Sequence, residues 1–177
     1  MTLIVSGDSP SLSGTYQGGA VTSGTAQAST SGTSIDFTGI PSWVKRITIL
    51  LNGVSTSGTS LWQVQIGAGS VDTTGYKSAY GAQNVAATAL GLGTATTGFV
   101  LTVVVNAAQT SQGIVTLATL GSNIWLQNGI VNNIDSTAYQ NTSSGSKTTS
   151  GTLDRVRITT VNGTDTFDAG SINILYE

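Results

Sequence analysis

The chain contains neither cysteine nor histidine among its 177 residues. The lack of cysteine excludes disulfides, thiolate nucleophiles and zinc–thiolate sites. The lack of histidine removes the commonest general base and metal ligand, so a Ser–His–Asp triad and a histidine-bound zinc ion are excluded as well. The carboxylates are scattered beside Gly, Thr and Asn, where Asp commonly forms turns. We therefore expect no enzyme, no cofactor and no metal site, and interpret Asp165 and Asp168 as turn residues rather than calcium ligands.

Charge is also scarce, since only 8% of the residues are charged, against about 25% in a typical soluble domain. The six Lys and Arg residues are scattered and the net charge is −2, which argues against a nucleic-acid partner because phosphate binding needs clustered cations. The first ten residues lack the basic and long apolar regions of a signal peptide. No apolar run approaches the length of a membrane span, so we expect no membrane insertion.

The pattern that is present is that of β-strands. Val156 and Ile158 alternate with Arg155 and Arg157, and most other apolar residues also recur with a period of two. Turn residues separate these runs, and no helix is convincing. The sequence predicts an all-β protein, an antiparallel β-sandwich of jelly-roll-like type. The predicted core is Phe37, Trp43, Ile47, Ile49, Phe99, Val103, Val156, Ile158, Ile172 and Ile174.

Several stretches predict other structures. Residues 98–106 are apolar on both parities, which predicts a central strand. Residues 67–97 are rich in Gly, Thr and Ala and predict long loops or short edge pieces, with room for one helical turn in 85–92. Residues 141–151 predict a polar loop, and Asn52-Gly53 a hairpin turn.

The composition divides the chain at residue 33. Residues 1–33 are dominated by Ser, Gly and Thr and have little to bury. We interpret them as an arm that attaches the protein or intertwines its subunits, with a flexible leader as the alternative. Residues 34–177 form the predicted sandwich domain.

Three tyrosines are candidates for surface contact. Tyr76, Tyr80 and Tyr139 lie in polar, loop-like sequence, and tyrosine suits both sugar rings and protein partners. The alternative is that each of them fixes a loop. Trp62 and Trp125 lie on predicted strands, where we expect core or subunit-interface positions.

Two long runs carry a resemblance to a known family. They are SIDFTGIPSWVKRITILLNGVSTSGTS (34–60) and LDRVRITTVNGTDTFDAGSINILYE (153–177). In this order they resemble the C-terminal domain of tailed-bacteriophage and prophage tail-fibre proteins. The segment between them, residues 61–152, is less familiar, as would suit a domain whose contact surface varies.

The resemblance implies a virion structural protein. We expect a tail-fibre or tail-tip domain that attaches without covalent chemistry to a host cell-surface glycan or protein. It implies a homotrimer on the virion surface, made in the host bacterial cytoplasm and joined to other virion proteins through its N-terminal arm. A head fibre or capsid decoration protein with the same domain is an alternative, since a leader of 33 residues stands where a long fibre has a shaft. A bacterial carbohydrate-binding module or adhesin is another, which a flat row of aromatic side chains on one sheet face would favour.

Overall fold

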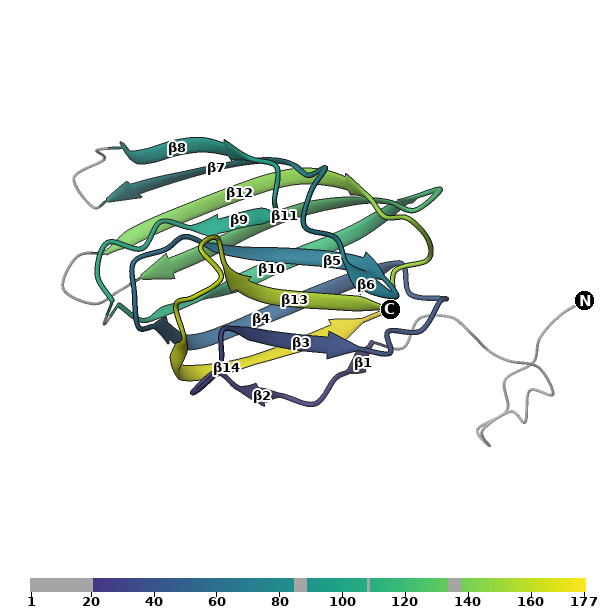
Figure 1. Ribbon diagram of the computed structural model, residues 1–177, viewed down its shortest axis with the longest axis horizontal. Helices are drawn as coiled ribbons and strands as arrows, with labels where there is room; N and C mark the ends of the chain where they lie inside the picture. The colour runs from purple at the N-terminus through teal and green to yellow at the C-terminus, as the bar shows by residue number, and fades with distance from the viewer. Residues whose placement is uncertain (1–20, 85–88, 108, 134–137) are drawn as a thin grey trace, which may run out of the picture.

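The protein is an antiparallel β-sandwich, as the sequence predicts (Figure 1). The structure, a computed structural model, describes residues 21–84, 89–107, 109–133 and 138–177, with only the backbone of 89 and 90. Every strand pair in these residues is antiparallel. They contain no helix long and apolar enough to cross a bilayer.

The larger sheet has nine strands in the order β1-β14-β4-β10-β11-β12-β7-β8, with β2 also paired to β14. Its strands are β1 (Thr22–Ser23), β2 (Gln27–Ala28), β4 (Arg46–Thr56), β7 (Lys77–Asn84), β8 (Ala89–Ala95), β10 (Ser111–Gly121), β11 (Ile124–Asn133), β12 (Tyr139–Thr148) and β14 (Phe167–Tyr176).

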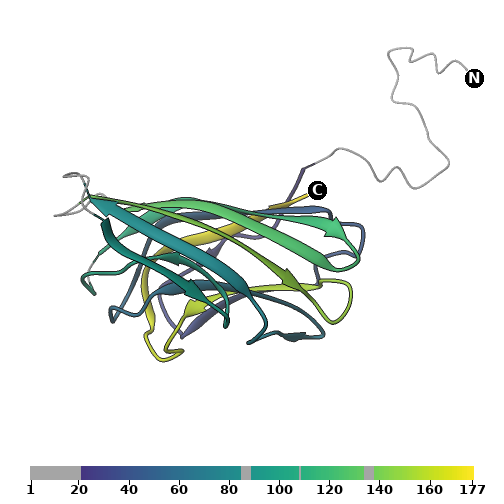
Figure 2. The ribbon, with the colours of Figure 1, turned by 90° about the horizontal axis from the view of Figure 1, so that it is seen from above.

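The smaller sheet has five strands in the order β3-β13-β5-β6, and β9 also pairs with β5. Its strands are β3 (Ser34–Thr38), β5 (Trp62–Ala68), β6 (Ser70–Val71), β9 (Phe99–Thr102) and β13 (Arg155–Thr160). This sheet covers one face of the larger one, as the two views together show (Figures 1 and 2). The apolar core fills the space between the sheets.

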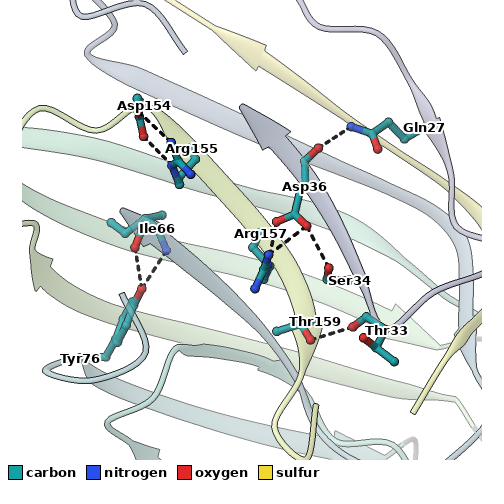
Figure 3. Close-up of polar contacts among 10 residues, drawn as sticks. All are labelled: Gln27, Thr33, Ser34, Asp36, Ile66, Tyr76, Asp154, Arg155, Arg157 and Thr159. Atoms are coloured by element: carbon teal, nitrogen blue, oxygen red, sulfur yellow. Dashed lines mark hydrogen bonds and ion pairs between the residues drawn. The ribbon is translucent and has the colours of Figure 1, made fainter. Parts of the chain in front are cut away.

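The two runs that resemble fibre proteins lie side by side in both layers. β3 pairs with β13 in the smaller sheet, and β4 pairs with β14 in the larger sheet. We call these four strands the frame. An ion pair spans β13 and β3: the guanidinium of Arg157 holds the carboxylate of Asp36, with Nε 2.7 Å from Oδ1 (Figure 3). The runs therefore form one structural unit although residues 61–152 separate them in the sequence.

Nine of the ten predicted core residues lie in or against the core. Eight are buried, and Trp43 is partly buried and packs with Tyr176. The prediction is wrong for Val103, which is half-buried. β9 ends at Thr102, so the strand predicted over residues 98–106 stops before it reaches Val103. Trp62 and Trp125 are buried in the core rather than exposed at a surface.

The predicted loops contain strands. β7 and β8 occupy most of residues 77–95, and β12 runs through the predicted polar loop at 141–151. Their sequences lack apolar alternation because one side faces solvent and the other a polar part of the interior. The predicted helical turn at 85–92 falls partly outside the described residues, and residues 89–92 are in a strand. β9 has four residues at a sheet edge, not a central position, and is buried because it packs over the larger sheet.

Asn52-Gly53 is a bulge inside β4, not a hairpin turn. The register of β4 against β14 and β10 shifts here, and Gly53 has a φ of 61°. Gly170 on β14, with a φ of 91°, lies against it, so that a Cβ added to Gly170 would come within 2.4 Å of Gly53 O. Glycine is therefore required where the two irregular strands meet.

Part of the predicted arm belongs to the sandwich. Residues 1–20 lie outside the described residues, but β1 and β2 pair with β14, and the backbone N–H of Gly24 donates to Ile174 O at 2.8 Å. The sheet therefore begins before the boundary predicted at residue 33.

Candidate binding face

The outer face of the nine-stranded sheet, the side turned away from the five-stranded sheet, is the most distinctive surface of the described residues. Strand register sorts its side chains into rows that run across the strands, because directly opposite residues lie about 5 Å apart on the same face. We use three rows: an amide row, an apolar row and a hydroxyl row.

The apolar row crosses six strands. Leu50 of β4 lies opposite Ile114 of β10, which lies opposite Ile130 of β11. The row continues through Thr142, Gly81 and Leu92. Ile114 is 56% exposed and Ile130 49% exposed, so this row presents large apolar side chains to solvent. A single exposed apolar residue is ordinary, whereas a contiguous row marks a contact surface.

Polar, uncharged rows flank the apolar row. On one side is the amide row, Gln112, Asn132, Gln140 and Gln83. On the other is the hydroxyl row, Thr48, Thr116, Asn128, Ser144, Ala79 and Thr94. Amides and hydroxyls both donate and accept hydrogen bonds, so these rows can bind groups of either kind.

An open hollow lies over the hydroxyl row. Its volume is about 860 Å³, and its lining includes Thr116, Ala118, Leu126, Asn128 and Ser144. Cationic side chains lie only near its margins, where Arg46 on β4 is opposite Ala118 and Lys77 on β7 is opposite Ser146. Between these two cations the outward positions of β10, β11 and β12 carry no charge. A partner on this face would therefore be held by shape, hydrogen bonds and apolar contact rather than by charge.

A buried polar network supports the face from beneath. The Asn141 amide donates to Val131 O at 2.9 Å and to Asn133 Oδ1 at 3.1 Å, while its Oδ1 accepts from Val103 N at 2.9 Å. Gln127 Nε2 donates to Ser143 Oγ at 2.8 Å. Gln127 Oε1 is buried without a hydrogen-bond partner in the described part of the chain, but the paired groups of Asn141, Asn133 and Ser143 tie β11 to β12 inside a low-dielectric interior.

Tyr76 is not the surface contact that the sequence predicts, because only 1% of it is exposed. Its hydroxyl accepts a hydrogen bond from Ile66 N at 2.7 Å and lies 3.1 Å from Ile66 O (Figure 3). Along one edge of β5, β6 pairs with Gly67 and β9 pairs with residues up to Val64. The Tyr76 hydroxyl lies between β6 and β9 and binds the backbone of Ile66. Burial raises the pKa of Tyr76 far above its ordinary value.

Tyr80 and Tyr139 are half-buried and point to the inner side of the sheet. Tyr80 lies opposite Ser143 and beneath Gly93, where an added Cβ would come within 2.5 Å of Tyr80 Oη. Tyr139 lies opposite Asn84 at the start of β12. The three tyrosines therefore do not form one surface, and the outward positions of the described strands carry no aromatic side chain.

The carboxylates of the described residues are used in turns and ion pairs. Asp165 accepts hydrogen bonds from Ser60 N at 2.9 Å and Asn162 Nδ2 at 2.7 Å, whereas Asp168 contacts Ser55 Oγ. Within the same residues, no three acidic side chains are grouped as a metal site would require.

The outer face could not be found from the sequence, because its rows depend on register between distant strands. Alternation indicates which residues share a side of one strand, but not that Leu50, Ile114 and Ile130 stand in line. The low charge content was the one available signal. Comparisons of the chain with protein-family models, with curated proteins and with solved structures found no match.

Proposed function

We propose that this chain is a virion structural protein of phage or prophage origin, a tail-fibre or tail-tip domain that attaches to the host cell surface without covalent chemistry. The observation that carries the proposal is the pairing of its two fibre-like runs. They are distant in the sequence, yet β3 joins β13 and β4 joins β14. Two chance matches to short motifs would have no reason to pair with each other in both sheets, as these two runs do.

The remainder of the domain fits a non-covalent role. Residues 61–152 supply β5 to β12, so the less familiar segment between the two fibre-like runs builds most of the outer face. A rigid sheet with hydroxyl, amide and apolar groups can hold another protein surface, including that of a second copy. In the proposed homotrimer, three weak contacts would add through multivalency.

The alternative function, a carbohydrate-binding module or adhesin, is less well supported than the fibre domain. Such a module would hold sugar rings against a flat aromatic row, and the outward strand positions that the structure describes have none. The head fibre or decoration protein shares the proposed fold and differs in where the protein is located on the virion.

Binding to bacterial cells tests the attachment role. Fluorescently labelled full-length protein should bind a subset of strains in a panel, and excess unlabelled protein should protect those strains from phage that carry it. Albumin labelled to the same extent gives the background. Binding to no strain, together with no protection, would contradict the attachment role.

The location of the protein tests the tail assignment. Gold-labelled antibody against the purified chain should mark the tail or tail tip of virions in electron micrographs. Gold on the head would replace the tail assignment by the decoration role, and virions without gold would refute the virion role altogether.

A further inference from the structure

We propose that the outer face of the nine-stranded sheet is covered, in the assembled protein, by the same face of other copies of this chain. The inference deepens the proposed function. It depends on that function only for the expected number of copies, which is three in the proposed homotrimer. It starts from exposed apolar side chains: Ile114 and Ile130 on the apolar row, and Leu126 on the row beyond the hydroxyl row, are between 45% and 56% exposed. A face that stayed in water would gain nothing from apolar side chains at its centre.

The size of the face fits a subunit contact. Six strands, from β14 to β7, lie side by side in it, and β11 and β12 each have 10 residues. With strands about 4.8 Å apart and a rise of about 3.3 Å per residue, the face measures roughly 950 Å². A stable interface of standard size takes about 800 Å² from each partner. The face is therefore large enough for a lasting contact.

The chemistry of the rows favours an identical partner. Two copies of a charged face would repel each other, but the outward positions of β10, β11 and β12 are uncharged. Amides and hydroxyls donate and accept alike, so the amide and hydroxyl rows of one copy can pair with those of another. The two cations, Arg46 and Lys77, lie at opposite sides of the uncharged region, where the margin of an interface tolerates charge.

A ligand of another kind would need features that the face lacks. A glycan site would use aromatic rings, an acidic partner would need a cationic patch, and a basic partner would need carboxylates. The outward positions of β10, β11 and β12 carry no aromatic ring and no carboxylate. A second copy needs none of these, because its own rows are the complement.

Light scattering of the purified full-length chain gives the first test. We expect a mass two or three times the 17.9 kDa of one chain at micromolar concentration, and three copies would agree with the proposed trimer. A mass of one chain would overturn the inference. A stable oligomer that binds no cells would uphold it and refute the attachment role instead, so the two can fail separately.

Variants locate the contact. Ile130→Lys places a charge at the centre of the apolar row and should reduce the mass to that of one chain. Val161→Lys is the matched control, since Val161 is 44% exposed in the turn after β13, and it should leave the mass unchanged. An Ile130→Lys protein that keeps the oligomer would overturn the inference.

A second variant guards against misfolding. Thr116→Arg lies on the neighbouring hydroxyl row and keeps the apolar row intact. Both variants should retain the wild-type circular dichroism spectrum and lose the oligomer together. If both stay folded and oligomeric, the copies meet through another surface and the inference is wrong.

Discussion

The frame and the part of the sheet formed by β7, β8, β10, β11 and β12 are built from similar antiparallel strands, but different forces hold them together. The frame packs apolar side chains inward, with Ile49, Ile158 and Ile174 at most 3% exposed. It also carries the ion pairs of Asp36 with Arg157, Asp154 with Arg155 and Arg46 with Glu177. In the other part, β10 and β11 also place Val115, Leu117, Trp125 and Val131 in the core, and β11 and β12 add buried amides beneath an uncharged face. The frame therefore combines apolar packing with ion pairs, whereas the other part combines it with a buried polar network.

The difference has a physical reason. An apolar interior needs no specific partner, so it tolerates changes on the outer surface of the same strands. A buried amide network specifies one arrangement, since each group left without a partner costs free energy. The network can thus keep the rows of the outer face in register although β7, β8 and β12 have few bulky residues.

The largest loss of stability is expected in the frame. Ile49 of β4 is fully buried between the sheets, so Ile49→Ala should lower the free energy of unfolding by about 2–5 kcal/mol through lost burial and a cavity. Urea unfolding followed by tryptophan fluorescence measures the change. Val161→Ala, in an exposed turn, is the control, and an equal loss there would contradict the distinction.

A smaller loss is expected in the buried network. Asn141→Ala removes the acceptor of Val103 N and the donor to Val131 O and Asn133 Oδ1. Each buried group left unsatisfied costs about 1–3 kcal/mol, although water entering the space reduces the sum. We expect less cost than for Ile49→Ala, with faster hydrogen exchange in β12 than in β13. Unchanged exchange in β12 would show that the network does not order the sheet.

Alkaline pH should act through Tyr76. Burial raises its folded-state pKa above the unfolded value of about 10. Its contribution to the free energy of unfolding is therefore complete below pH 10. This contribution decreases as the pH rises further, because Tyr76 loses its hydroxyl proton at lower pH in the unfolded chain than in the folded protein. Thermal melts between pH 8 and 11 should show this decrease in the wild type and a weaker one in Tyr76→Phe. The same slope in both proteins would assign it to another group.

The smallest effect is expected at an exposed ion pair. Asp36 and Arg157 are about one-third exposed, so solvent screens them and a double-mutant cycle with Asp36→Asn and Arg157→Gln should give about 0.2–1 kcal/mol. Raising the salt concentration should reduce it. A coupling above about 3 kcal/mol would mean that charge, rather than burial, holds the frame together.

The frame could be predicted from the sequence and much of the remainder could not. Ile47, Ile49, Val156 and Ile158 alternate with polar residues, and this pattern alone predicts half-buried strands. β12, with the sequence YQNTSSGSKT, has no such pattern, because both of its sides are polar. Long-range pairing turned this segment into a strand, and no local signal carries that information.

The burial of Tyr76 was unpredictable for a similar reason. Its neighbours Gly75 and Lys77 are exposed, and only the gap along β5 at Ile66 gives its hydroxyl a buried partner. The candidate face depends likewise on register, which sequence alternation alone leaves undefined.

Chemical cross-linking tests the central claim, that the outer face meets another copy, most directly. The chain has no cysteine, so Ile114→Cys creates a single thiol in the apolar row, and Val161→Cys creates one outside it. With a short bis-maleimide at micromolar protein concentration, the account predicts covalent dimers for Ile114→Cys and almost none for Val161→Cys. Equal yields in the two variants, or only monomer from Ile114→Cys, would contradict it.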